Sequence, residues 1–270
     1  MKFKVNNEEV FASTGGRPFD SKKPLIIFVH GSGLTHMCWV LQTRSFAFHG
    51  YSVLALDLPG HGLSKGKSLQ SIEEMAEWLK DVIDTVGFKE TSLVSHSQGC
   101  LISLECAARY PEKIKTLSLM GGAGAIPMNP ELLALAEKSD PKAVDLMMDF
   151  AHGPSGHFGG HPVPGLYHMN TGSMLVQSRE IKDTLGVDFR ACQNYINGFE
   201  AAKKLSLPTL SILADQDRMC RLKDGQKLAK HIKNSEVHII KNCGHMMLLE
   251  EADQTLAILK KFIKNNYPTN

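Results

Sequence analysis

The 270-residue sequence has no marked excess of charge of either sign. Thirty Lys and Arg residues stand against 28 Asp and Glu residues, and the formal net charge is +2. A nucleic-acid footprint or a polybasic membrane patch needs a concentrated positive charge. The charge balance therefore indicates neither nucleic acid nor a membrane as partner.

Long hydrophobic runs and paired cysteines are also missing. Residues 1–6 lead into polar residues, unlike a signal segment, and no stretch approaches the roughly 18 apolar residues that a membrane helix needs. The six cysteines are scattered without a C-x-x-C pair, so neither a disulfide framework nor a zinc site is indicated. We expect reduced thiols and a cytoplasmic location.

Short apolar runs bounded by turn residues are what the sequence has instead, and they are typical of strands covered on both faces. These runs lie at residues 25–29, 52–56, 91–95, 116–120, 209–213 and 236–240. Helical patterns alternate with them, at 71–86, 99–110, 224–231 and 253–265. The alternation predicts an α/β protein with a doubly wound, mostly parallel sheet.

The alternation stops between about residues 126 and 199. Helical pieces surround a loop at 153–168 that is rich in Gly, His and Pro, and no strand pattern occurs there. Insertions at the carboxyl edge of a parallel sheet cover the place where such folds bind ligands. We predict a core of residues 1–125 and 200–270 and a helical cap of residues 126–199. A homodimer formed through the outer helices or the cap is a further possibility.

A candidate nucleophile follows the third apolar run. The residues SHSQG at 95–99 join a strand to a helix, as a nucleophile elbow requires, and Ser97 occupies the central position. Ser95 stands where such elbows usually have their first glycine. We assign nucleophilic attack to Ser97 and a steric role to Ser95.

A serine needs a base and an acid that orients the base. His245 follows the strand at 236–240, and Asp215 and Asp217 follow the strand at 209–213, so all three lie at the same sheet edge as Ser97. His245 is the expected base. Spacing alone leaves the acid open between Asp215 and Asp217.

A glycine-rich turn follows the first apolar run. It reads His30-Gly31-Ser32-Gly33, without the G-x-G-x-x-G pattern of a dinucleotide site. The amides of Ser32 and Gln98 are the candidate oxyanion hole. We expect Gly31, Gly33 and His96 to line the substrate site, with space filling as the alternative role for His96.

Five motifs in this order resemble the α/β-hydrolase superfamily over nearly the whole chain. They are HGSG at 30–33, DLPGHGLS at 57–64, SHSQG at 95–99, DQD at 215–217 and GHM at 244–246. The resemblance implies that Asp217 is the acid, although Ala214 replaces the glycine of the family's G-x-x-D pattern. It also implies a structural role for 57–64, and the serine at 97 disfavours haloalkane dehalogenases and epoxide hydrolases, which use aspartate.

The resemblance implies a serine hydrolase that cleaves a small-molecule ester or related acyl bond without a cofactor. A carbon–carbon bond hydrolase and a non-catalytic ligand-binding homologue are the alternatives. Four histidines of the cap raise a metal site as a further possibility, but their spacing matches no standard zinc pattern, and we expect no metal. They are His152, His157, His161 and His168.

Overall fold

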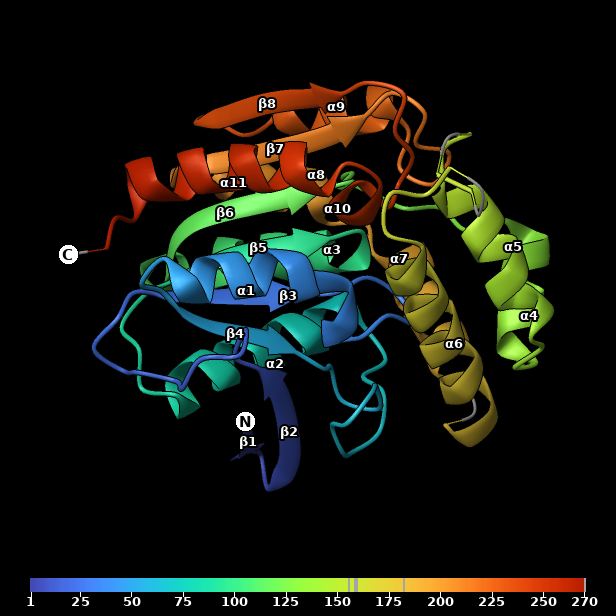
Figure 1. Cartoon of the computed structure of the whole chain (residues 1–270), viewed down its shortest axis with the longest axis horizontal. Coiled ribbons are helices and arrows are strands. Elements are labelled where there is room, and N and C mark those ends of the chain that lie inside the picture. Colours follow the sequence, from blue (N-terminus) through green and yellow to red (C-terminus); the bar gives the residue numbers. More distant parts are fainter. Residues whose placement is uncertain (155, 158–159, 182, 270) are drawn as a thin grey trace.

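One mixed sheet organises the protein in the computed structural model, which describes residues 1–154, 156–157, 160–181 and 183–269. Its strand order is β1-β2-β4-β3-β5-β6-β7-β8 (Figure 1). The strands are β1 (Lys2–Val5), β2 (Glu8–Ser13), β3 (Leu25–Val29), β4 (Ser52–Leu56), β5 (Thr91–His96), β6 (Ile114–Met120), β7 (Thr209–Ala214) and β8 (Ser235–Ile240). All neighbours from β4 to β8 run parallel. The predicted doubly wound, mostly parallel sheet is confirmed.

Helices cover both faces of this sheet. The helices α1 (Val40–Phe48) and α11 (Ala252–Asn266) pack on one face, and α2 (Ile72–Thr85), α3 (Gln98–Arg109), α8 (Gly198–Lys204) and α9 (Leu222–Ala229) pack on the other (Figure 1). Side chains of β3 alternate between the two cores: Ile27 faces one, and Ile26 and Phe28 face the other. Burial on both faces explains why the central strands are continuous apolar runs.

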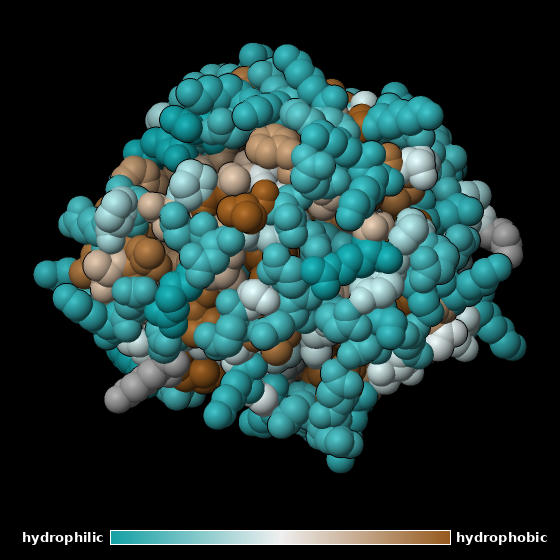
Figure 2. All heavy atoms as spheres, turned by 180° about the vertical axis from the view of Figure 1, so that it is seen from behind, coloured by the Kyte–Doolittle hydropathy of each residue, from teal (hydrophilic) through white to brown (hydrophobic). Residues whose placement is uncertain are grey.

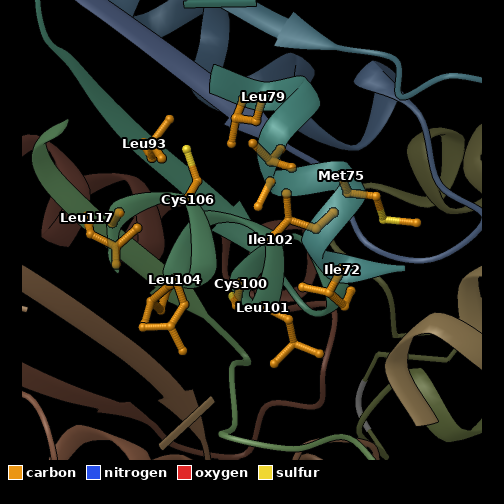
Figure 3. Close-up of a cluster of buried hydrophobic side chains, with 14 of the residues drawn as sticks. Ile72, Met75, Leu79, Leu93, Cys100, Leu101, Ile102, Leu104, Cys106 and Leu117 are labelled. Atoms are coloured by element: carbon orange, nitrogen blue, oxygen red, sulfur yellow. The ribbon is translucent and has the colours of Figure 1, made fainter. Parts of the chain in front are cut away.

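The core beneath α2 and α3 fixes the position of the β5–α3 junction. Figure 3 shows Met75 and Leu79 of α2 beside Ile102 of α3, with Leu93 of β5 close by, and all four side chains are buried. The helix α2 starts at Ser71, whose hydroxyl accepts a hydrogen bond from the Glu74 amide. This packing holds the residues after β5 at the sheet edge.

Helices of the chain between β6 and β7 lie beyond the carboxyl ends of the parallel strands (Figure 1). They are α4 (Pro130–Glu137), α5 (Lys142–Ala151), α6 (Pro164–Glu180) and α7 (Thr184–Asn194). We call residues 126–199 the cap, and these domain bounds stay a prediction. The loop predicted at 153–168 is wrong at its end, because α6 begins at Pro164, a residue suited to the first helical turn. Residues 155, 158 and 159 of that loop lie outside the described residues.

Two features near the N-terminus do not follow from the apolar runs. The antiparallel hairpin β1–β2 turns at Asn6 and Asn7, both with positive φ, as a two-residue hairpin turn requires. The helix α1 is rich in aromatic and β-branched residues, which favour helix weakly.

Shorter elements complete the fold: η1 (His36–Trp39), η2 (Pro111–Lys113) and α10 (Met247–Glu250).

The surface is mixed. On the face shown in Figure 2, hydrophilic side chains surround scattered hydrophobic ones, and the most exposed large apolar side chains of the described chain include Phe48 and Ile196. Among the described residues, no helix has the length and apolar character needed to cross a membrane. The cytoplasmic location stays a prediction.

Candidate active site

Ser97 lies at a sharp turn between β5 and α3. Its φ of 55° is in the left-handed region, which a non-glycine residue rarely adopts. A side chain on Gly99 would meet the Val29 carbonyl oxygen at 2.5 Å, so only glycine lets α3 approach β3 this closely. The Ser95 hydroxyl, by contrast, donates to the Ser118 carbonyl within the sheet at 3.1 Å. The turn therefore presents Ser97 at the sheet edge and leaves Ser95 in the strand.

His245 and Asp217 form a buried hydrogen-bonded pair at the same edge. His245 Nδ1 lies 2.7 Å from Asp217 Oδ2, while Asp217 Oδ1 accepts hydrogen bonds from the amides of Met219 and Cys220, both at 2.8 Å. Because the carboxylate can only accept, Nδ1 carries a proton and Nε2 is the ring nitrogen left to accept one. That Nε2 is buried and has no partner within the described chain. It is available to a group in the site.

Asp215 has a different environment, although it is only two residues from Asp217. Its Oδ1 accepts a hydrogen bond from the Asn242 amide at 2.7 Å, and its Oδ2 lies 3.8 Å from Lys241 Nζ. These contacts fix the turn between β7 and the loop after β8. Asp217, and not Asp215, is the carboxylate that contacts His245.

The turn after β3 brings backbone amides to Ser97. The Leu34 amide donates to the Gly31 carbonyl at 3.1 Å, and Gly33, the third residue of the turn, has a φ of +66°. A Cβ at Gly31 would lie 2.9 Å from the Ser97 Cβ, so the glycine permits this approach. The Ser32 amide makes no backbone hydrogen bond in the described chain, and the Gln98 amide, in the first turn of α3, has no intrahelical acceptor. Both amides can donate hydrogen bonds to a developing negative charge.

His96 supports the histidine of this pair. Its Nε2 donates to the His245 carbonyl oxygen at 3.0 Å, and the two ring centroids are 4.6 Å apart. Burial holds the pKa of His96 well below its ordinary value, and the neighbouring His245 lowers it further. His96 is therefore neutral, and its Nδ1 is a buried acceptor without a partner among the described residues. Its contact with substrate, like that of Gly31 and Gly33, stays a prediction.

The cap closes over these groups. Ser97 is only 8% exposed, and Met174 and Leu185 of the cap lie against Gly33.

Of the cap histidines, His152 and His161 have ring centroids 5.4 Å apart, and burial lowers the pKa of His152 to about 4. The described residues contain no group of three or more side chains placed to hold a metal ion.

Gly121, directly after β6, is a site residue that the sequence pattern did not reveal. It has a φ of +59°, and a Cβ there would lie 3.0 Å from both Cε1 and Nδ1 of His245 and 3.4 Å from Asp217 Oδ2. The only signal in the sequence is a Gly-Gly pair at the end of a strand. Gly121 leaves the space that the imidazole occupies.

The variant Gly121→Ala is expected to lower kcat/KM by about 100-fold, because a displaced imidazole loses its alignment with Ser97. Gly87→Ala is the matched control: Gly87 has a similar φ of +77°, but a Cβ there meets nothing within 4 Å. Both variants carry similar backbone strain, and Gly121→Ala adds the contact with His245, so thermal unfolding should shift at least as far in Gly121→Ala and only that variant should lose activity. Equal activity of the two variants would contradict this role of Gly121.

Comparisons with known proteins agree with this geometry. A model described as the alpha/beta hydrolase family matches residues 26–258. The chain is 27% identical to the 2-hydroxy-6-oxononadienedioate/2-hydroxy-6-oxononatrienedioate hydrolase of Paraburkholderia phymatum over 256 residues, which cover 89% of this chain and 87% of that protein. The protein of the same name from Escherichia coli K12 is 26% identical over 263 residues, covering 88% and 86%.

Solved structures are similar over nearly the full length. A thermophilic esterase is 26% identical, with a TM-score of 0.80 and coverage of 99% of this chain and 98% of that chain. The enol-lactonase of Burkholderia xenovorans has a TM-score of 0.85 at 19% identity and covers 98% of this chain and 100% of that chain. At this identity the likeness shows the fold alone. The predicted α/β-hydrolase fold and resemblance are confirmed.

Proposed function

The chain belongs to the α/β-hydrolase family, and we propose that it is a serine hydrolase that cleaves a small, uncharged ester or a related acyl bond. The observation that carries the proposal is the buried His245–Asp217 pair, whose free imidazole nitrogen lies at the sheet edge that presents Ser97. A nucleophile, a base and an acid in this chain order on this fold are what acyl transfer requires.

The proposed reaction has two steps. Ser97 Oγ attacks the ester carbonyl and gives its proton to His245 Nε2, while the amides of Ser32 and Gln98 stabilise the oxyanion. Collapse of the tetrahedral intermediate breaks the bond to the alcohol, which leaves with the proton from His245. Water, deprotonated by the same Nε2, then attacks the acyl-enzyme, the bond between the acyl carbon and Ser97 Oγ breaks to release the acid, and His245 returns the proton to Ser97 Oγ. Asp217 stabilises the imidazolium in both steps.

A carbon–carbon bond hydrolase is the second candidate, because the curated relatives carry that kind of name. The substrate in that name is a dioate, a molecule with two carboxylate groups. A buried carboxylate needs a cationic or hydrogen-bonding partner, since removing it from water costs several kcal/mol. Among the described residues of this chain, no Lys or Arg side chain is buried. The buried cation that the structure places near the site, His61, already pairs with Asp188, so an uncharged acyl group is favoured over a dioate.

A matched pair of esters tests this proposal. We expect p-nitrophenyl butyrate to be hydrolysed with a kcat/KM at least about 100-fold above that of mono-p-nitrophenyl succinate, whose acyl chain has the same length but ends in a carboxylate, because the carboxylate would be buried without a partner. Release of p-nitrophenolate measures both rates, and esters from acetate to decanoate give the chain-length preference.

The competing outcomes are distinct. Cleavage of 2-hydroxy-6-oxononadienedioate, without turnover of either ester, would replace the ester proposal with the carbon–carbon bond hydrolase. Binding of ligands without turnover of any of these compounds would favour a non-catalytic homologue.

A further inference from the structure

Asp188, in the cap helix α7, is a fully buried carboxylate that the proposed reaction does not use. Its Oδ2 accepts two hydrogen bonds from the core: one from the Gly33 amide at 2.8 Å and one from His61 Nε2 at 2.9 Å. Its relative exposure is 0%. A buried carboxylate is costly unless it is paired and hydrogen-bonded, and these two bonds offset that cost when the cap is seated on the core.

The same residue reaches the other side of the candidate oxyanion hole. The backbone carbonyl of Asp188 accepts a hydrogen bond from the side-chain amide of Gln98 at 3.2 Å. Gly33 directly follows Ser32, and Gln98 carries the second candidate amide. One residue of the cap therefore binds the residue that follows Ser32 and the side chain of Gln98, next to the two candidate amide donors.

Gln177, in the cap helix α6, repeats this arrangement. Its Nε2 donates to the Gly33 carbonyl oxygen at 2.9 Å, and its Oε1 accepts from the Gly62 amide at 2.9 Å. Gly33 is thus held at its N–H by α7 and at its C=O by α6. Because Gly33 is the positive-φ residue of the turn that carries Ser32, these two bonds fix the turn and with it the direction of the Ser32 amide.

His61, in the core, forms an ion pair with Asp188 of the cap. Its two ring nitrogens face only acceptors, the Pro59 carbonyl at 3.1 Å and Asp188 Oδ2 at 2.9 Å, so the ring donates on both sides as an imidazolium. Burial alone would lower the pKa of His61, but the charge and hydrogen bond of Asp188 outweigh it and raise that pKa above its ordinary value. The cap is seated by an ion pair, not by apolar packing alone.

We propose that Asp188 and Gln177 are positioning residues of the oxyanion hole, so that the hole is complete only when the cap is seated on the core. The inference rests on the proposed acyl-transfer function. With Ser97 only 8% exposed, substrate reaches it when the cap separates from the core, and this breaks the bonds to Gly33. Closure over a bound substrate then restores the hole, which couples substrate enclosure to catalytic competence.

The test compares three variants with the wild type. Asp188→Leu and Gln177→Leu remove the bonds to Gly33 at similar side-chain size, whereas Asp188→Asn keeps an oxygen that can accept from the Gly33 amide. We measure kcat and KM on the best ester, and the single-turnover burst of p-nitrophenolate from diethyl p-nitrophenyl phosphate. In the burst reaction Ser97 Oγ attacks phosphorus, p-nitrophenolate leaves, and His245 takes the proton of the serine.

The expected result is a fall in kcat of about 10²–10³-fold in both Leu variants, the cost of a lost oxyanion donor, with KM changed by less than about threefold. The phosphorylation rate should fall by a similar factor, and Asp188→Asn should restore most of both rates. Arg190→Gln is the control, because Arg190 lies on the same helix but pairs at the surface with Glu137 and Asp183. It should behave as the wild type.

Wild-type rates in folded Asp188→Leu and Gln177→Leu would overturn the inference, as would equal losses in Asp188→Asn and Asp188→Leu. If Asp188→Leu does not fold, Gln177→Leu decides by the same criteria. A wild type that reacts with neither ester nor phosphotriester overturns the proposed function and this inference with it, whereas a reactive wild type with equally reactive Leu variants overturns the inference alone.

Discussion

Replacing Ser97 by Ala is expected to reduce kcat for ester hydrolysis by about 10⁶-fold, the loss seen when the nucleophile of a serine triad is removed. A left-handed turn, with a φ of 55°, presents the Ser97 hydroxyl at the sheet edge where His245 Nε2 has no partner within the described chain. The variant should fold normally, because alanine removes only one oxygen atom and leaves the backbone unchanged.

Ser95→Ala provides the matched control for this prediction. Ser95 is two residues away in β5, and its hydroxyl donates to the Ser118 carbonyl. Losing that bond should cost about 1 kcal/mol of stability and leave kcat near the wild-type value. Stopped assays with p-nitrophenyl esters, together with intact mass measurement after diethyl p-nitrophenyl phosphate, give activity and labelling for each variant. Phosphorylation of Ser97→Ala at a single site would show that another residue is the nucleophile.

Replacing Asp217 by Asn is expected to lower kcat by about 10⁴-fold, although the substitution is nearly isosteric. The carboxylate accepts the Nδ1 proton of His245 at 2.7 Å and leaves the lone pair on Nε2. An amide group that donates to Nδ1 instead would move the ring proton to Nε2, where it cannot take the proton of Ser97. It would also remove the negative charge that stabilises the imidazolium.

Asp215→Asn distinguishes the two acids that spacing left open. An asparagine at 215 can still accept from the Asn242 amide, so only the 3.8 Å contact with Lys241 loses its charge. A pair whose lysine is exposed, as Lys241 is, contributes at most about 1 kcal/mol to stability. We therefore expect Asp215→Asn to retain kcat within about twofold of the wild type. A larger loss in Asp215→Asn than in Asp217→Asn would reverse the assignment.

The proposed coupling of the cap to the oxyanion hole gives the loop at 57–64 a more specific role than the family resemblance implies. His61 and Gly62 of this loop bind Asp188 and Gln177 of the cap. The loop thus forms, with Gly33, the surface on which the cap is seated. If the inference holds, substitutions in either cap residue act on the rate of acylation and not on substrate affinity.

The sequence by itself determined the central sheet and the order of the site residues. A strand buried on both faces must be apolar throughout, so residues 25–29 and 52–56 matched β3 and β4. The hairpin β1–β2 did not follow in this way, because its strands are partly exposed and therefore form no continuous apolar run. These are local patterns, and local physics fixes them.

Only the tertiary structure decided which polar groups meet. Asp215 and Asp217 follow the same strand, and the packing of His245 against Asp217 and Gly121 separates them. Asp188 looks like any polar helical residue in the sequence, yet it binds Gly33 from 155 positions away. A hydrogen bond depends on distance in space, which no window of sequence contains, and the buried partners of a charge are therefore known only once the chain has folded.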